Sequence, residues 1–191
     1  KFHGPKGIGV LYIRNGVKIS NLIHGGGQER GKRAATENVA GMAGIAKAIS
    51  LATENLEKNT AIMKEKRDRL IRGIQERIPY CRLNGPTDET RLCNNVNFSF
   101  QYVEGESILM MLDMKGVAAS SGSACASGSL DPSHVLLAIG LPHEIAHGSL
   151  RLSVCEDTTD EDVDYVLEVL PPIIERLRMM SPLYEEVLKK S

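Results

Sequence analysis

The chain has 191 residues, of which 42% are hydrophobic, and it carries 23 lysines and arginines against 24 acidic residues. This length is enough to bury a core and favours one domain or slightly more. The basic residues are scattered among acids, so we expect neither a nucleic acid nor a membrane as a partner. No apolar run approaches the roughly 18 residues of a membrane span, and no signal peptide is seen, which indicates a cytoplasmic protein.

Four cysteines lie far apart in the sequence, at positions 81, 93, 125 and 155, with no C-x-x-C pair. The five histidines show no metal-ligand spacing around them, so we predict no metal site. We take all four cysteines as reduced thiols, because a chain of this size does not need disulfides for a core. Cys81, Cys93 and Cys155 are interpreted as small apolar filler.

The first predicted element is a strand over residues 9–13, followed by the hairpin signal Arg14-Asn15-Gly16. Residues 24–38, HGGGQERGKRAATEN, contain four glycines and no apolar residue larger than alanine, which predicts a loop. Thr36 stands where a helix N-cap is expected. A hydroxyl at a helix start behind a glycine-rich loop can also bind a phosphate, and at this point both interpretations stay open.

Two long helices follow, one from Glu37 over about five turns and a second amphipathic one that ends before Pro79. The charged side of the second helix, which includes Arg67, is interpreted as a solvated face. Alternating residues predict a half-buried strand over 96–100, and short helices are expected over 106–114 and 132–139. The last of these is expected to begin at Asp131.

The stretch SSGSACASGSL, residues 120–130, surrounds Cys125 with serines, glycines and alanines. A buried structural cysteine is normally enclosed by branched apolar neighbours, and these neighbours have little side-chain area to bury. About six residues on each side could carry the thiol through as much as roughly 20 Å. We therefore expect a mobile loop that presents the thiol rather than packing it.

The segment GSLRLSV, residues 148–154, alternates apolar and polar residues, which predicts a strand with Arg151 pointing away from the apolar face. Arg151 is either a fork for a carboxylate or one more surface arginine. Thr158 and Glu161 predict a capping box before a long terminal helix. We expect Pro171 and Pro172 to interrupt and kink this helix.

Taken together, four stretches resemble the cysteine desulfurases of the NifS and IscS type, in the subgroup with a long nucleophile loop. They are KFHGPKGIGVLYIR, HGGGQERGKRAATEN, SSGSACASGSLDPSHVL and GSLRLSV, and they occur in the order of the family's motifs. The resemblance implies that Lys1 forms a Schiff base with pyridoxal 5'-phosphate and that Thr36 binds the cofactor phosphate in the partner subunit. It also implies Cys125 as the catalytic nucleophile and Arg151 as the residue that binds the substrate carboxylate. Ala35 departs from the pattern, since the family usually has glycine there.

The fold implied by this resemblance is α/β, the C-terminal part of a fold-type I pyridoxal phosphate enzyme of the aminotransferase-like kind. Residues 1–50 would be the tail of the large cofactor-binding domain, including the HGGGQERG loop. Residues 51–191 would be an α+β small domain that carries the nucleophile loop. In the family the groups that hold the pyridine ring precede the Schiff-base lysine, with which this chain begins, so we expect the isolated chain to be inactive.

The implied activity is that of a sulfurtransferase, which converts L-cysteine to L-alanine and leaves a persulfide on Cys125. The sulfur would pass to an acceptor such as an iron-sulfur cluster scaffold or another carrier, and the enzyme would be a homodimer. Two alternatives stay open. One is another fold-type I aminotransferase or lyase in which Cys125 is incidental, and the other is a non-catalytic C-terminal domain that binds a partner.

Overall fold

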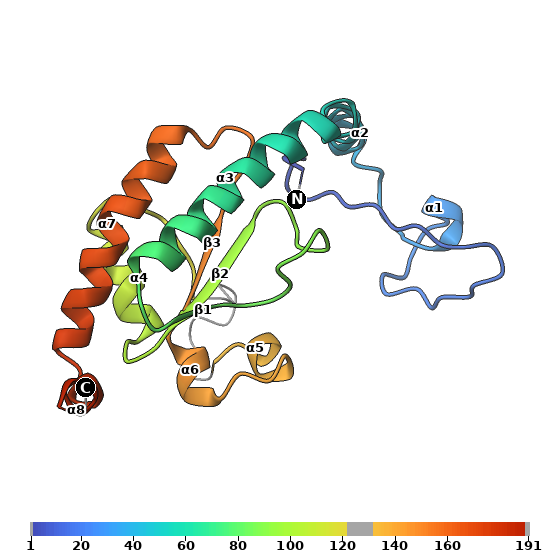
Figure 1. Ribbon diagram of the computed structural model, residues 1–191. Coiled ribbons are helices and arrows are strands. Elements are labelled where there is room, and N and C mark those ends of the chain that lie inside the picture. The colour runs from blue at the N-terminus through green and yellow to red at the C-terminus, as the bar shows by residue number, and fades with distance from the viewer. Residues whose placement is uncertain (1, 122–131, 190–191) are drawn as a thin grey trace. The chain divides into compact units, whose positions relative to one another are not determined.

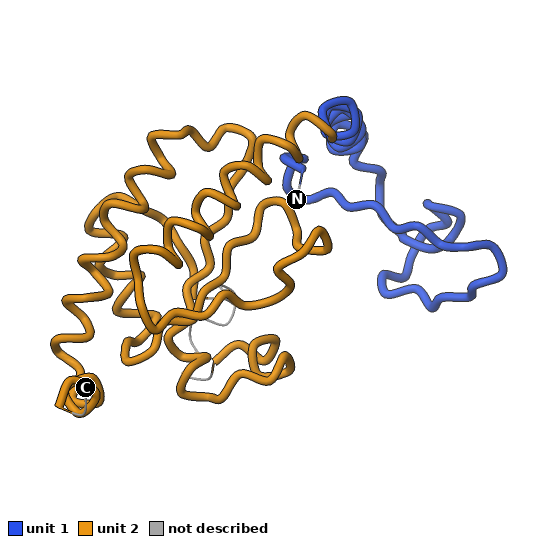
Figure 2. Tube along the Cα trace, in the orientation of Figure 1, with its two compact units in different colours: residues 1–56 blue, residues 57–191 orange. Residues whose placement is uncertain are grey.

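The structure, a computed structural model, describes residues 2–121 and 132–189 (Figure 1). The chain divides into two compact units, residues 1–56 and residues 57–191, which are coloured separately in Figure 2. Among the described residues, no helix combines the length and the apolar character that crossing a bilayer requires. We describe each unit by itself.

The first unit consists of a long irregular segment, the short helix α1 (Gln28–Gly31) and helix α2 (Val39–Glu54). The predicted turn forms, because Val17 N donates to the carbonyl of Arg14 at 3.1 Å and Gly16 has a φ of 85°. The strand predicted over residues 9–13 is wrong, since no strand is assigned within residues 2–56. A strand exists only where a neighbouring strand hydrogen-bonds to it, and this run has none in the first unit.

Helix α2 begins two residues later than the sequence predicts. Its N-cap is Asn38, whose side-chain oxygen accepts a hydrogen bond from Gly41 N at 2.9 Å. The expectation that Thr36 caps the helix is therefore wrong. Asn38 has the side chain that an N-cap needs, and it leaves the hydroxyl of Thr36 outside the helix.

The second unit is built on a three-stranded antiparallel sheet in the order β1-β2-β3, with strands Cys81–Leu83, Asn95–Phe100 and Ser149–Ser153. The register of the two longer strands pairs Asn97 with Arg151 and Phe98 with Leu150. This confirms the strands predicted over 96–100 and around Arg151. Their period of two places the apolar side chains on one face of the sheet.

Helices α3 (Leu56–Arg77), α4 (Gly105–Asp113) and α7 (Asp160–Met179) lie beside the sheet in Figure 1 and close the core with it. Phe98 and Phe100 stack with their ring centroids 6.0 Å apart, and both are essentially inaccessible to solvent. Gly73 of α3 permits close packing on α7, because a Cβ there would come within 2.6 Å of a methyl group of Leu167. The helices predicted after residues 50 and 105 are thus confirmed.

The remaining helices are short. Helices α5 (His134–Ala138) and α6 (His143–His147) share a small apolar cluster made by Leu136, Leu141 and Ala146. The N-cap of α5 is Ser133, whereas the predicted start, Asp131, lies outside the described residues.

Helix α8 (Pro182–Leu188) follows α7 near the end of the chain. Its residue Tyr184 lies against two other tyrosines, with ring centroids 6.3 Å from Tyr80 and 5.6 Å from Tyr102. The guanidinium of Arg178 lies 5.7 Å from the ring centroids of Tyr80 and Tyr184.

The start of α7 carries a capping box one residue later than the sequence suggests. Thr159 accepts from Asp162 N at 3.0 Å, and the Asp162 carboxylate accepts from Thr159 N at 2.9 Å. The helix then continues through Pro171 and Pro172, so the predicted interruption is wrong. The carbonyl that Pro171 leaves without an N–H donor is bonded by Arg77 of α3 instead.

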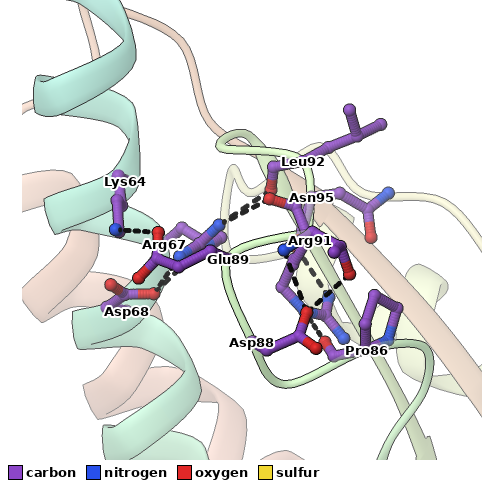
Figure 3. Close-up of polar contacts among 10 residues, drawn as sticks. Lys64, Arg67, Asp68, Pro86, Asp88, Glu89, Arg91, Leu92 and Asn95 are labelled. Atoms are coloured by element: carbon purple, nitrogen blue, oxygen red, sulfur yellow. Dashed lines mark hydrogen bonds and ion pairs between the residues drawn. The ribbon is translucent and has the colours of Figure 1, made fainter.

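Arg67 was expected on a solvated face of α3, and this is wrong, because only 5% of its surface is exposed. Its guanidinium bonds to Asp68 at 2.8 Å and donates to the carbonyls of Arg91 and Leu92, each at 3.1 Å (Figure 3). Arg91, itself 8% exposed, donates to the carbonyls of Pro86 and Asn95. The two arginines thus order the connection between β1 and β2 by bonding its backbone carbonyls.

Candidate active site

Arg151 lies in the middle of β3, the edge strand of the sheet in the second unit. Its backbone pairs with Ser120, since Ser120 N donates to Arg151 O at 3.1 Å and Arg151 N donates to Ser120 O at 2.5 Å. These groups point away from β2, so Asn97 and Arg151 form the non-hydrogen-bonded pair of the β2–β3 ladder. Residue 120 is therefore held directly beside the arginine that sequence analysis assigns to the substrate carboxylate.

Cys125 and the segment 122–131 lie outside the described residues. The chain that leads to them is fixed up to Ser121, whose carbonyl accepts a hydrogen bond from the Ser149 hydroxyl at 2.7 Å. Cys125 is the fifth residue after Ser120 in the sequence, so the two can lie at most about 17 Å apart. The structure thus brings together Arg151 and the origin of the segment that contains the predicted nucleophile.

Two glycines allow the segment at Ser121, the start of α4 and the start of β3 to pack closely against one another. A Cβ on Gly105 would lie 2.8 Å from the carbonyl oxygens of His147 and Ser149 and 3.4 Å from the Cβ of Ser121. A Cβ on Gly148 would lie 2.1 Å from the carbonyl oxygen of Phe100. Since real Cβ atoms do not approach backbone this closely, the start of α4 and the start of β3 depend on glycine at both positions.

Thr36 belongs to the first unit, where it is exposed and lines a cavity of about 820 Å³. Lys32, Arg33, Glu29 and Glu37 line the same cavity, and the Arg33 guanidinium donates to the carbonyl of Ala34 at 2.7 Å. A hydroxyl, an ammonium and a guanidinium are suitable donors for a phosphate. Thr36, Lys32 and Arg33 therefore offer donors of the kind that the phosphate end of pyridoxal 5'-phosphate needs, although Glu29 and Glu37 equal the two basic residues in number, so the cavity lining has no net positive charge from these four residues.

Backbone conformation around Thr36 is unusual. Ala35 has a φ of 90°, and Glu29 and Arg30 have φ values of 49° and 58°. Such left-handed conformations cost roughly 1–2 kcal/mol for a residue other than glycine. The position where the sequence departs from the family's glycine thus adopts a conformation that favours glycine.

Lys1, the predicted site of cofactor attachment, also lies outside the described residues. The structure consequently describes two of the four predicted site residues, Thr36 in the first unit and Arg151 in the second.

Three further thiols are described, and each is partly buried. Cys81 packs against the core, and burial raises the pKa of its thiol although Arg178 opposes this. Because the thiolate is the nucleophile, burial makes Cys81 less reactive. Cys155 lies 3.7 Å from the Thr158 hydroxyl. No group of three or more potential metal ligands occurs within residues 2–121 and 132–189.

Sequence reasoning missed Ser149, Gly105 and the cavity position of Lys32. Ser149 stands two residues before Arg151, so strand alternation would have placed both on one face. Gly105 is the first residue of α4 and had no distinguishing signal in the sequence. Its role depends on the carbonyls of His147 and Ser149, which are distant in the sequence.

Comparison with known proteins agrees with these motifs. A family model described as aminotransferase class-V matches residues 1–166. The chain is 65% identical over 190 residues to cysteine desulfurase IscS of Clostridium botulinum strain Hall, covering 99% of this chain and 48% of that protein. It is 59% identical to cysteine desulfurase IscS of Methanosarcina thermophila, covering 96% of this chain and 45% of that protein.

Solved structures also resemble the chain. A NifS-like protein matches with a TM-score of 0.79 and 38% identity over 92% of this chain and 44% of its own. A structure described as SspA in complex with cysteine matches with a TM-score of 0.58 and 30% identity, covering 83% of this chain and 42% of its own. The chain spans about half the length of the relatives it matches.

Proposed function

Because the chain belongs to the aminotransferase class-V family, we propose that its protein is a pyridoxal phosphate-dependent cysteine desulfurase. The observation that carries this proposal is the pairing of Ser120 with Arg151. It places the residue to which we assign the substrate carboxylate beside the start of a segment that contains a thiol. A transaminase needs only the first of these two features, whereas transfer of sulfur to the enzyme needs both.

In the proposed reaction, Arg151 holds the carboxylate of L-cysteine by charge-assisted hydrogen bonds. The Cys125 thiolate attacks the substrate sulfur. The bond between sulfur and the substrate β-carbon breaks as the bond between the two sulfurs forms. The β-carbon takes the electron pair and a proton, which yields alanine, while the sulfur stays on Cys125 as a persulfide. The β-carbon is reduced and the transferred sulfur is oxidised, so no other redox agent is needed.

Pyridoxal 5'-phosphate supplies an electron sink for this chemistry when it is bound. We assign Thr36 to its phosphate, and Lys32 and Arg33 line the same cavity. The Lys1 amine is assigned to cofactor attachment and to proton transfer at the substrate α-carbon. These assignments are supported by the donor set around Thr36 and by the position of Lys1 in the motif that begins the chain.

We further propose that the protein acts as a homodimer and passes its sulfur to an acceptor protein, such as an iron-sulfur scaffold. The dimer is supported by the surface of the first unit, where Tyr12 and Leu22 are 84% and 92% exposed. Large apolar side chains of this kind are normally covered by another part of the protein or by a second subunit. The acceptor is supported by the chemistry, because a persulfide must be discharged before the next turnover.

The test uses the full-length protein loaded with pyridoxal 5'-phosphate and incubated with L-cysteine. We expect alanine to form and the mass of Cys125 to increase by one sulfur atom. Cys125→Ser should abolish sulfur transfer and leave the cofactor absorbance unchanged. Cys93→Ser, which replaces another partly exposed thiol, is the matched control and should behave as the wild type. Product formation without sulfur on Cys125 would favour a lyase or aminotransferase instead.

A further inference from the structure

Helix α6 consists of the sequence HEIAH, residues 143–147, in which two histidines are four residues apart. Side chains at positions i and i+4 of a helix lie on the same face, one turn apart. Histidine spacing around the cysteines predicted no metal site. The spacing within this pair, however, is the one with which two histidines of a helix bind a single metal ion. The proposed function makes no use of either histidine.

The two imidazole rings lie close together. Their centroids are 4.7 Å apart, and their planes make an angle of 66°. A metal ion bonded to one nitrogen of each ring at about 2.1 Å would lie roughly 3.2 Å from each ring centre. Angles of about 90–109° at the metal then place the ring centres roughly 4.5–5.2 Å apart. The observed separation falls within this range, so one ion can bind both rings after rotation about side-chain bonds.

Both imidazoles are accessible to a ligand. His143 is exposed and His147 is partly buried. Within residues 2–121 and 132–189, neither side chain forms a hydrogen bond, and each ring contacts the other. A neutral imidazole binds a metal ion through the lone pair of a ring nitrogen. The described contacts therefore leave a nitrogen of each ring available for coordination.

The backbone that carries the pair is anchored in the second unit. Ala146 is 1% exposed and belongs to the small apolar cluster with Leu141. After His147 the chain continues into Gly148, whose carbonyl accepts a hydrogen bond from Phe100 N of β2 at 2.8 Å. Because the helix is already fixed, a metal ion needs to order only two side chains. This keeps the entropic cost of binding low.

The ligands restrict the class of metal ion. Imidazole nitrogen suits Ni²⁺, Cu²⁺ and Zn²⁺ better than the hard cations Mg²⁺ and Ca²⁺, which prefer oxygen. In the part of the chain that the structure describes, no third histidine, cysteine or carboxylate completes a group with the pair. Structural zinc sites have four protein ligands and catalytic ones have three. The pair fits neither type, and water would fill the remaining positions.

We propose that His143 and His147 form a two-ligand chelating site for a divalent transition metal ion of this imidazole-binding class. The ion bonds one nitrogen of each ring. The proposal does not depend on the desulfurase function, because neither histidine is assigned to it. If the rings form only an edge-to-face aromatic pair, replacing either histidine leaves metal binding unchanged.

The experiment titrates Ni²⁺ into the full-length protein by calorimetry, in a buffer without thiols or chelators. Ni²⁺ is chosen because Cu²⁺ would oxidise the cysteines. His143→Gln and His147→Gln should each weaken binding at this site about 100-fold, because a single tethered ligand loses the advantage of the chelate. His134→Gln replaces an exposed histidine of the neighbouring helix α5 and should leave the affinity unchanged. The double variant His143→Gln/His147→Gln identifies any Ni²⁺ sites elsewhere in the protein.

An affinity for Ni²⁺ that is the same in the wild type and in His143→Gln would overturn the proposal. The same holds if each single variant only halves the number of weak sites, because two independent imidazoles would behave in that way. Wild-type binding that equals that of the double variant would also contradict it. If His147→Gln does not fold, His143→Gln decides the question alone, since His143 is exposed.

Discussion

The guanidinium of Arg77 donates a hydrogen bond to the carbonyl of Leu167 at 2.8 Å. Leu167 precedes Pro171 by four residues, so this is the carbonyl that an N–H at position 171 would bond in an unbroken helix. Proline has no N–H, and a side chain of α3 takes its place. The contact explains how α7 continues through the two prolines and joins α7 to α3.

A double-mutant cycle tests this relationship. Arg77→Met should lower the free energy of unfolding by about 1–2 kcal/mol, because it leaves the Leu167 carbonyl without a donor. In a Pro171→Ala background the backbone N–H returns, and the same substitution should cost clearly less. Arg72→Met, which changes an exposed arginine of the same helix, is the control. Equal costs in both backgrounds, measured by chemical denaturation, would contradict the assignment.

Asp160 should make the stability depend on pH. Its carboxylate lies 2.6 Å from Lys66 Nζ and 2.5 Å from Arg69 Nη1. The hydrogen bond from Lys66 and the charges of Lys66 and Arg69 lower the pKa of Asp160. Since the folded pKa lies below the unfolded value of about 3.9, the stabilisation is complete above about pH 5 and is lost as the pH falls through the folded pKa.

Asp160→Asn should therefore reduce stability at neutral pH, and its difference from the wild type should shrink as the pH is lowered from 5 to 3. Thermal unfolding across this range measures the effect. Asp157→Asn replaces an exposed aspartate that precedes the helix and serves as the control. A difference from the wild type that does not depend on pH would show that Asp160 acts through packing and not through its charge.

Ala35→Gly should stabilise the loop that carries Thr36. Ala35 has a φ of 90°, and removing its Cβ relieves strain of roughly 1–2 kcal/mol, partly offset by the greater freedom of glycine in the unfolded chain. We expect a net gain of up to about 1 kcal/mol and slower loss of cofactor from the full-length protein. Ala34→Gly is the matched control. Ala34 is buried and has no positive φ, so this change should destabilise. A destabilised Ala35→Gly protein would contradict the strain argument.

Arg151→Met should raise the KM for cysteine about 10- to 100-fold, the range expected for losing charged hydrogen bonds to a carboxylate. The cofactor absorbance should not change. The backbone bonds between residue 151 and Ser120 survive the substitution, so persulfide formation at saturating cysteine should fall much less. Arg82→Met on β1 replaces an exposed strand arginine and should leave the KM unchanged. Steady-state kinetics of the full-length enzyme would show whether binding and transfer are separated in this way.

The sequence was most informative where the pattern is local. The alternation around Phe98 and around Arg151 predicted both long strands, because a sheet with one buried face requires a period of two. The chemical motifs were equally local. They identified the family by residue order alone, and that assignment is confirmed by the match to residues 1–166 and by a relative that is 65% identical over 190 residues.

The failures arose where a distant part of the chain supplies the partner. The run 9–13 has strand-like residues but no neighbouring strand within residues 2–56. Arg67 has the charge of a surface residue but is buried by the carbonyls of Arg91 and Leu92. The residues of the first case favour a strand but lack the neighbouring strand that would stabilise it. In the second case, hydrogen bonds to a distant segment outweigh the preference of an arginine for the surface.

Residue types and their order were enough to predict which residues are suited to the chemistry: a thiol among small residues at Cys125, a strand arginine at Arg151 and a hydroxyl after a glycine-rich loop at Thr36. The pairing of Ser120 with Arg151 and the hydrogen bond from Ser149 to Ser121 became visible only in the folded chain. These contacts join segments about 30 residues apart, and they depend on β3 leaving one edge free and on Gly105 leaving space. Residue types can be read directly from the sequence. Hydrogen bonds between distant segments form only when packing of the core places those segments side by side.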